Sequence, residues 1–211
     1  MHPAIYQIMA GGAMNEFKTH FAALLFLLLA ACGQQASEPL TEPPLAGARI
    51  GGPFTLTDAK GQTVRDTDFA GKYRVMYFGY TFCPDVCPID MQNIGAGLKQ
   101  FEASDPALAA KVVPIFITVD PARDTPAVVG EFVANFHPRA VGLTGSQEAI
   151  TAVLKSYAGM ATKRDSPNPD AYLVDHTRIT YLMGPEGQPI ALIPADESPQ
   201  AVVDVLKRWV R

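Results

Sequence analysis

Short hydrophobic runs alternate with mixed segments along most of the chain. Residues 74–80 (RVMYFGY) and 111–119 (KVVPIFITV) are nearly continuous apolar runs rich in β-formers, which favours buried central strands. Thr125 is placed to cap a helix whose first residue is Pro126. The full set of expected elements is a hairpin at 54–57 and 62–65, helices at about 88–101, 125–136, 146–157 and 198–211, a strand at 140–143, a long polar loop at 158–175, and a hairpin at 178–183 and 189–193.

The order of these elements predicts the fold class. Two strands come first, strands and helices then alternate, and a hairpin and a helix close the chain. Such an order favours a mixed sheet covered by helices. We expect an α/β, thioredoxin-like three-layer fold, with a central mixed sheet, helices on both faces and an N-terminal β-hairpin. A length of 211 residues suits one domain of this kind.

Residues 21–31 (FAALLFLLLAA) form an unbroken apolar run near the start of the chain. The run is shorter than the roughly 20 residues that a membrane span requires, and it fits the apolar region of a signal peptide. It ends in Leu29-Ala30-Ala31-Cys32, which resembles a bacterial lipobox, so we expect Cys32 to be lipidated. The alternative is a buried apolar helix with an incidental cysteine. Met14 is a second possible start, because the segment MNEFKTH is a compact n-region.

The segment after Cys32 contains prolines, glycines and polar residues without periodicity, which is typical of a flexible tether. The expected organisation is therefore a lipoprotein signal peptide at 1–31, a lipidated N-terminus and tether at 32–53, and a folded domain at 54–211. We expect a lipid-anchored protein of the bacterial cell envelope, with the domain facing the periplasm or the exterior. Thiols in that location are exposed to oxidation.

Net charge and cysteine content limit the possible functions. A net charge of -4 argues against a nucleic-acid partner, because proteins that bind nucleic acids usually carry stripes of basic residues. Three cysteines are too few for a disulfide scaffold. With Cys32 assigned to the lipid, Cys83 and Cys87 remain as a pair in the domain.

Cys83 and Cys87 lie between an expected central strand and the helix that follows it. At a helix N-terminus, unpaired N–H groups and the helix dipole favour a thiolate. Three residues separate the two cysteines, whereas thioredoxin-type redox catalysts have two. Two thiolates suit a soft metal such as Cu(I), and an added imidazole also accommodates Cu(II), whereas closed zinc sites take four ligands. A structural disulfide is the alternative interpretation.

A third metal ligand has to come from elsewhere in the chain. Of the four histidines, His2 and His20 fall in the segment expected to be removed. His137 precedes Pro138 at a helix end, where we expect a solvated loop. His176 lies at the end of the long loop, and in a thioredoxin-like fold that loop passes over the cysteine turn. Spacing alone does not make His176 a ligand.

Three ordered motifs resemble the Sco (SenC) family of membrane-anchored copper proteins. They are GYTFCPDVCPIDM at 79–91, FITVDPARDTP at 116–126 and DHTRITYLMGPEG at 175–187. The resemblance covers roughly residues 50–211. It implies a thioredoxin-like fold that binds copper through Cys83, Cys87 and His176. It also implies a role in assembling the binuclear copper centre of cytochrome c oxidase. The implied partners are the copper-accepting oxidase subunit, the membrane, and other copper chaperones or thiol reductants.

Two other functions remain open. A thiol–disulfide reductase would use Cys83 or Cys87 to attack a disulfide of a copper-accepting partner, and a thiol peroxidase would need an attacking and a resolving cysteine. The copper recipient, the copper oxidation state, the resting state of the thiols, the membrane and the oligomeric state are not specified. For Asp85 and Asp90 the two interpretations are that they tune the site or, as we favour, that they cap the helix N-terminus. We also expect Arg123 and Asp124 to form an ion pair, Tyr80 and Phe82 to pack in the core or shield the metal, and Met160 to be a possible auxiliary ligand.

Overall fold

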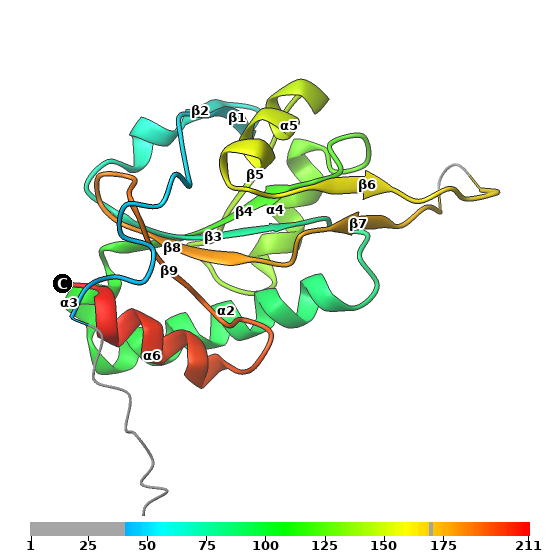
Figure 1. Ribbon diagram of the computed structural model, residues 1–211. Coiled ribbons are helices and arrows are strands. Elements are labelled where there is room, and N and C mark those ends of the chain that lie inside the picture. The colour runs from blue at the N-terminus through cyan, green and yellow to red at the C-terminus, as the bar shows by residue number, and fades with distance from the viewer. Residues whose placement is uncertain (1–40, 169–170) are drawn as a thin grey trace, which may run out of the picture. The chain divides into compact units, whose positions relative to one another are not determined.

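Three parallel strands form the centre of the sheet in the computed structural model, which describes residues 41–168 and 171–211 (Figure 1). The central strands are β3 (Tyr73–Gly79), β4 (Val112–Thr118) and β5 (Val141–Thr144). They lie in a seven-stranded sheet of order β2-β1-β5-β4-β3-β8-β9. Antiparallel strands flank them: β1 (Thr55–Asp58) and β2 (Thr63–Arg65) on one side, and β8 (Thr180–Met183) and β9 (Pro189–Leu192) on the other. The predicted mixed sheet and N-terminal hairpin are confirmed.

Helices cover both faces of this sheet. On one face lie α2 (Val86–Ser104), α4 (Pro126–Ala134) and α6 (Pro199–Trp209), and α3 (Pro106–Ala109) follows α2. On this face Phe116 of β4 packs between the rings of Tyr77 and Phe132, at 6.2 and 5.0 Å between centroids. The other face carries α5 (Gln147–Ser156) and the 3-10 helix η1 (Asp66–Phe69). There Phe78 packs on Tyr157, at 5.2 Å between centroids. The three-layer fold is as predicted.

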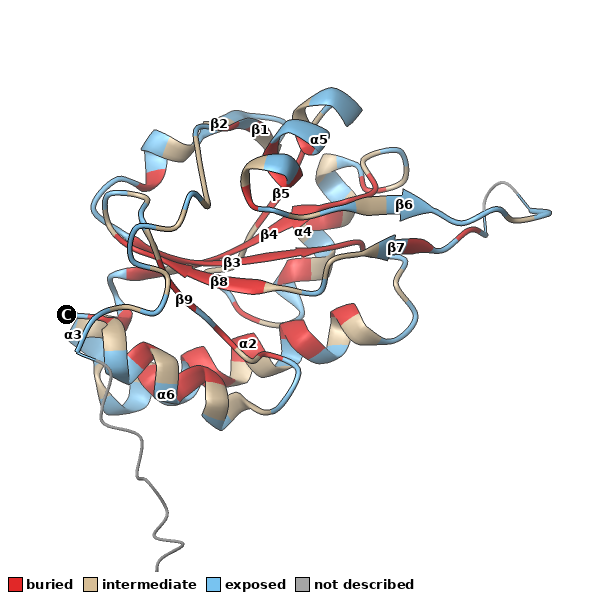
Figure 2. Ribbon diagram, viewed as in Figure 1, coloured by how far each residue is buried: buried red, intermediate tan, exposed pale blue. Residues whose placement is uncertain are grey.

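The buried strands and the helix caps explain why these residues form these elements. All seven residues of β3 are buried, which agrees with its continuous apolar pattern (Figure 2). Three helices begin with the hydroxyl caps expected from the sequence: Thr125 accepts from Val128 N, Ser146 from Ala149 N and Ser198 from Ala201 N. α2 begins at Val86, two residues before the expected start, so Cys87 lies in its first turn.

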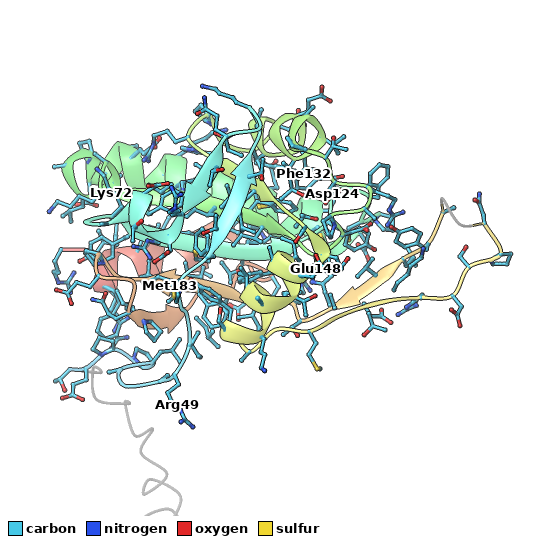
Figure 3. All side chains as sticks on the ribbon, turned by 90° about the horizontal axis from the view of Figure 1, so that it is seen from above. Arg49, Lys72, Asp124, Phe132, Glu148 and Met183 are labelled. Atoms are coloured by element: carbon cyan, nitrogen blue, oxygen red, sulfur yellow. The ribbon has the colours of Figure 1, made fainter. Side chains whose placement is uncertain are left out.

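The predicted loop at 158–175 contains a second hairpin. β6 (Ala161–Lys163) and β7 (Val174–His176) pair antiparallel as a separate two-stranded sheet. They form an arm that projects beyond the main sheet in two perpendicular views (Figures 1 and 3). Each strand is only three residues long, and the polar, proline-containing sequence between them hides the alternation that would predict a strand.

The segment before β1 contacts the sheet at the end opposite the cysteine turn. Leu45 N donates to Ile190 O at 3.0 Å and Gly51 N to Ser156 O at 2.8 Å, so part of the expected tether packs on the domain. Ile190 lies in β9, across β8 from the start of β3, whereas the cysteines follow the end of β3. Cys32, the signal-peptide run and both candidate start residues lie outside the described residues. Within residues 41–168 and 171–211, no helix is long and apolar enough to cross a membrane.

Candidate metal centre

The cysteine turn begins where β3 ends, at Gly79. Cys83 N donates to Tyr80 O at 3.2 Å, which closes the turn that leads into α2. Cys87 is fully buried at the start of α2, and Cys83 is half-buried. A Cβ atom at Gly79 would lie 3.0 Å from Cys87 Sγ and 2.7 Å from the Tyr77 ring. Glycine at this position therefore lets the backbone of β3 approach the Cys87 thiol closely.

A cysteine takes the place expected for an aspartate at the start of α2. Asp85 occupies the N-cap position, but its side chain makes no capping hydrogen bond and is exposed, so the capping prediction is wrong. Cys87 N instead donates to Cys83 Sγ at 3.4 Å. The first thiol of the motif thus accepts a helix N-terminal N–H group, which is a contact that stabilises negative charge on sulfur.

His176 joins the cysteine turn from the root of the arm. Its Nε2 atom lies 3.5 Å from Cys87 Sγ, and its Nδ1 atom lies 3.2 Å from Thr177 O. A carbonyl oxygen only accepts, so the neutral imidazole carries its proton on Nδ1 and turns the Nε2 lone pair toward the thiol. The Tyr80 ring packs edge-on against the imidazole, with centroids 5.9 Å apart. The histidine is thus held in the tautomer that a metal ligand requires.

Burial dominates the protonation of both groups. It raises the pKa of the Cys87 thiol to about 12, above its ordinary value. It also lowers the pKa of His176, because a charged imidazolium is poorly solvated there. The expectation of a favoured thiolate at Cys87 is therefore wrong for the metal-free protein. Helix position favours the thiolate, but loss of water around Cys87 outweighs that effect.

An ion pair lies beneath the Cys87–His176 contact. Arg178 Nε donates to Asp90 Oδ2 at 2.8 Å, and its Nη2 donates to Oδ1 at 2.5 Å. Tyr77 OH donates to the same carboxylate at 3.0 Å. Asp90 lies three residues after Cys87 in α2, and Arg178 lies two residues after His176. The pair therefore ties the helix that carries one candidate ligand to the segment that carries another, as a second layer of contacts.

Arg123 connects its own loop to two other segments around the site. Its guanidinium carbon lies 3.6 Å from the Tyr172 ring centroid and 4.8 Å from that of Phe82. Its Nε donates to Asp120 Oδ2 at 2.6 Å, and Tyr172 OH donates to Asp120 Oδ1 at 2.7 Å. The carboxylate that pairs with Arg123 is thus Asp120, which corrects the expected pair with its neighbour in sequence.

Asp124 has a different role from the one expected. Its carboxylate accepts from Thr81 N at 3.0 Å and from the hydroxyls of Thr81 and Thr118, each at 2.6 Å. Burial raises the pKa of this carboxyl, although these hydrogen bonds oppose the shift. Asp124 therefore links the end of β4 to the residues just before Cys83, and it organises the turn without an ion pair.

Other residues considered from sequence are placed away from the thiols or at the rim. His137 is buried rather than solvated: its Nδ1 accepts from Arg139 N at 3.2 Å and its Nε2 lies 3.3 Å from Glu102 Oε1. Its burial corrects the loop prediction. Met160 is 75% exposed and Phe82 is 51% exposed, while Tyr80 is buried against His176. The sequence predicted no role for Asp120, Tyr172 or Arg178, although Asp120 and Arg178 lie within the motifs at 116–126 and 175–187.

The two cysteines are free thiols in this structure. Within the described part of the chain, no group of three or more His, Cys, Asp or Glu side chains is arranged to hold a metal ion. The structure brings Cys87 and His176 together and leaves Cys83 Sγ against the helix N-terminus. Two soft sulfur atoms and one imidazole nitrogen are nevertheless the donor types that suit copper.

Comparison with known proteins decides the family. The SCO1/SenC family profile matches residues 42–211. The chain belongs to the SCO1/SenC family. Protein SenC of Rhodobacter capsulatus is 43% identical over 159 residues, which cover 75% of this chain and 70% of that protein. The structure of Bradyrhizobium japonicum ScoI with copper bound is 38% identical, with a TM-score of 0.69, and the match covers 76% of this chain and 99% of that one.

Copper therefore accompanies this fold in structures of Sco relatives. A more distant Sco structure, of BsSco, has a TM-score of 0.59 at 24% identity over 80% of this chain and 95% of that one. Its description places it in the Sco family of cytochrome c oxidase assembly proteins and reports a disulfide switch. The chain spans about half the length of mitochondrial SCO2 of Saccharomyces cerevisiae and of mitochondrial SCO1 homolog 1 of Arabidopsis thaliana.

Proposed function

We propose that this protein is a copper metallochaperone that binds copper through Cys83, Cys87 and His176. The observation that carries the proposal is the approach of His176 Nε2 to Cys87 Sγ, at 3.5 Å, from segments 89 residues apart in sequence. Family membership and the copper-bound relatives support it. Cys83 adds a second soft donor from the same turn, and a turn of its side chain from the helix N-terminus would complete a three-ligand set.

The contacts around the site support reversible copper binding. Burial keeps Cys87 protonated without a metal, so copper must displace a proton from sulfur when it binds. His176 needs no such loss, because its Nε2 lone pair already faces the thiol. The Asp90–Arg178 ion pair fixes the spacing of the two segments. Cu(I) is the oxidation state that two thiolates favour most.

We further propose that the protein delivers copper to the copper-accepting subunit of cytochrome c oxidase. The description of BsSco as a cytochrome c oxidase assembly protein supports this partner. Lipidation of Cys32 would hold the protein on a membrane of the bacterial cell envelope, with the domain outside the cytoplasm. Partner copper chaperones or thiol reductants would keep Cys83 and Cys87 loaded or reduced.

Thiol–disulfide exchange is the second candidate function. The half-buried Cys83 is the thiol that a partner disulfide can reach, and its sulfur accepts an N–H from the start of α2. In that reaction Cys83 would attack the partner disulfide and release one partner thiol. Cys87 would then attack the mixed disulfide, which leaves the second partner thiol and a Cys83–Cys87 disulfide. A dithiol that reduces its partner could prepare it to accept copper.

Copper titration separates these functions. The reduced chain with Cys32→Ser, which removes a third thiol, is expected to bind one Cu(I) per chain. In a separate titration with Cu(II), it is expected to give a thiolate-to-Cu(II) absorption. Cys83→Ser and Cys87→Ser should each abolish that absorption, and His176→Asn should shift it. His137→Asn is the matched control, because that imidazole is buried elsewhere, and it should leave the spectrum unchanged. An unaltered spectrum in His176→Asn would contradict the ligand set.

A further inference from the structure

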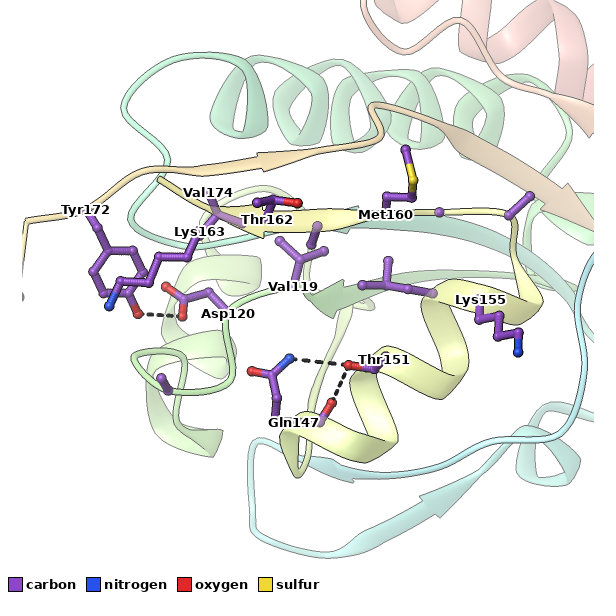
Figure 4. A pocket seen from close by; sticks show the side chains of 15 residues that line it. Val119, Asp120, Gln147, Thr151, Lys155, Met160, Thr162, Lys163, Tyr172 and Val174 are labelled. Atoms are coloured by element: carbon purple, nitrogen blue, oxygen red, sulfur yellow. Dashed lines mark hydrogen bonds between the residues drawn. The ribbon is translucent and has the colours of Figure 1, made fainter. Parts of the chain in front are cut away.

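A pocket of about 760 Å³ lies between the arm and the helix α5 (Figure 4). Residues 159–163, which include β6, form one wall, and Gln147, Thr151, Leu154 and Lys155 from one face of α5 form the other. Val119 and Asp120 lie at its base. We call this space the β6–α5 groove. The three candidate metal ligands do not line it, so it is distinct from the metal centre.

The outer edge of β6 has unpaired backbone groups. Arg164 N donates to Leu173 O at 2.8 Å and Thr177 N donates to Met160 O at 2.9 Å, which marks these two cross-strand pairs as hydrogen-bonded. Bonded and non-bonded pairs alternate in an antiparallel ladder. The N–H and C=O groups of the residues at 161 and 163 therefore point away from β7.

Two further observations support this assignment of the edge. Val174 pairs with Lys163, so the backbone N–H and C=O groups of Val174 must also point away from the partner strand. Its N–H donates to Tyr80 OH at 3.3 Å on the outer side of β7. Within residues 41–168 and 171–211, no backbone group or side chain bonds the outward groups of Ala161 or Lys163. An exposed strand edge of this kind is a template for another strand.

The charges in the groove favour an acidic occupant. Lys155 and Lys163 line it and are both exposed. Asp120 is the carboxylate of the lining, and it already accepts from Arg123 and Tyr172. The two ammonium groups of the groove thus have no carboxylate partner within its lining. Apolar lining from Val119 and Leu154 adds a surface for aliphatic side chains.

We propose that the β6–α5 groove binds an extended acidic segment of a partner protein, which adds to β6 as a third strand. Ala161 pairs with His176 across β6 and β7, so the added strand lies one strand away from the candidate ligand. The partner that would use this position is the copper acceptor, and this identification rests on the proposed function. The peptide site itself follows from the free edge, the opposing helix face and the two lysines.

The charge requirement is tested with a defined probe and the full reduced chain without copper. The probe is fluorescein-labelled Glu-Val-Glu-Val-Glu-Val-Glu with a blocked C-terminus, and binding is followed by fluorescence anisotropy. Lys155→Glu combined with Lys163→Glu is expected to raise Kd about tenfold. Lys60→Glu combined with Lys99→Glu changes charge equally on other exposed surfaces and should leave Kd unchanged. No binding to the unsubstituted chain, or equal Kd values for both double variants, would overturn the proposal.

The backbone requirement is tested with two N-methylated forms of the same probe. One form carries methyl groups on the valine nitrogens and the other on the internal glutamate nitrogens. A strand directs alternate N–H groups to its neighbour, so one form should lose binding and the other should keep it. Equal affinities would exclude strand addition. Because these assays contain no copper, a negative result here and a negative copper titration remain distinguishable.

Discussion

The guanidinium carbon of Arg123 lies 3.6 Å from the centre of the Tyr172 ring, and this contact joins the loop after β4 to the part of the arm just before β7. The same guanidinium reaches Phe82 in the cysteine turn, at 4.8 Å. Arg123 therefore touches both segments that carry the candidate ligands. It holds them through a planar charged group that packs on aromatic faces, which lysine cannot reproduce.

Removing the Arg123 guanidinium should lower the stability of the protein measurably. Arg123→Met deletes the partner of the buried Asp120 carboxylate, so we expect a loss of about 3 kcal/mol in the free energy of unfolding, measured by urea denaturation. Arg164→Met is the comparison, because Arg164 and Asp175 are each more than half exposed and their pair should contribute less than about 1 kcal/mol. Equal losses would contradict the role given to Arg123.

The Asp90–Arg178 pair predicts an asymmetry between its two deletions. The Asp90 side chain is 2% exposed, whereas that of Arg178 is 37% exposed. Arg178→Met leaves a buried carboxylate without its cation, at about 3–5 kcal/mol. Asp90→Asn leaves an arginine that can reach water, so its loss should be smaller, at about 1–2 kcal/mol. Thermal denaturation of both variants measures the difference, and a larger loss in Asp90→Asn would refute this explanation.

Stability should fall as the pH falls from 7 toward 5, in part because of His137. Burial lowers the pKa of His137, so the unfolded chain binds its proton first as the pH falls. Its contribution is present above the ordinary histidine pKa of about 6.5 and is lost as the pH falls through the lower folded value.

The pKa of Glu102 is also lowered: burial alone would raise it, but Arg139 and His137 outweigh that effect. Its contribution is lost at more acidic pH than that of the histidine. His137→Asn retains an acceptor for Arg139 N, and it should make the free energy of unfolding less dependent on pH between 7 and 5. Urea titrations of the unsubstituted chain and the variant at several pH values across this range give the free energy of unfolding as a function of pH. The same pH dependence in both chains would argue against a contribution from His137.

Gly79→Ala tests the close approach of β3 to Cys87. The added methyl would meet Cys87 Sγ at 3.0 Å and the Tyr77 ring at 2.7 Å, so we expect a loss of about 1–3 kcal/mol. Gly52→Ala is the control, because its nearest neighbour would be Ser156 Cβ at 3.5 Å, an ordinary contact. Melting temperatures show the contrast, and a neutral Gly79→Ala would mean that the backbone relaxes.

The more accessible of the two thiols should react faster with an alkylating reagent. Cys83 is half-buried and Cys87 is fully buried, so iodoacetamide is expected to label Cys83 first. Peptide mapping by mass spectrometry after short exposures, in the Cys32→Ser chain, reads the order directly. Faster labelling of Cys87 would show that the turn opens in solution.

The sequence predicts the sheet because its central strands are buried on both faces. Short, continuous apolar runs such as 74–80 and 111–119 fit few structures other than a buried strand. Thr125, Ser146 and Ser198 mark helix starts through local hydrogen bonds. The arm escapes prediction because its two strands are three residues each and are stabilised by contacts with distant groups. Val174 N bonds Tyr80 OH, a partner 94 residues away.

The site was predictable only where the information lies within one segment of the sequence. Cys83 and Cys87 stand out because their spacing and their position between strand and helix carry information within one segment. His176 required the family resemblance, since its approach to Cys87 depends on how the arm folds back. The contribution of burial to the pKa of Cys87 could not be predicted, because the surrounding side chains come from distant parts of the chain.

The segment before β1 packs on β9 at the end of the sheet opposite the cysteine turn. Leu45 N bonds Ile190 O in β9, at the level of the start of β3, while Cys83 and Cys87 follow the end of β3. A partner protein that approaches Cys83 at the end of β3 would therefore leave the contact between Leu45 and Ile190 undisturbed.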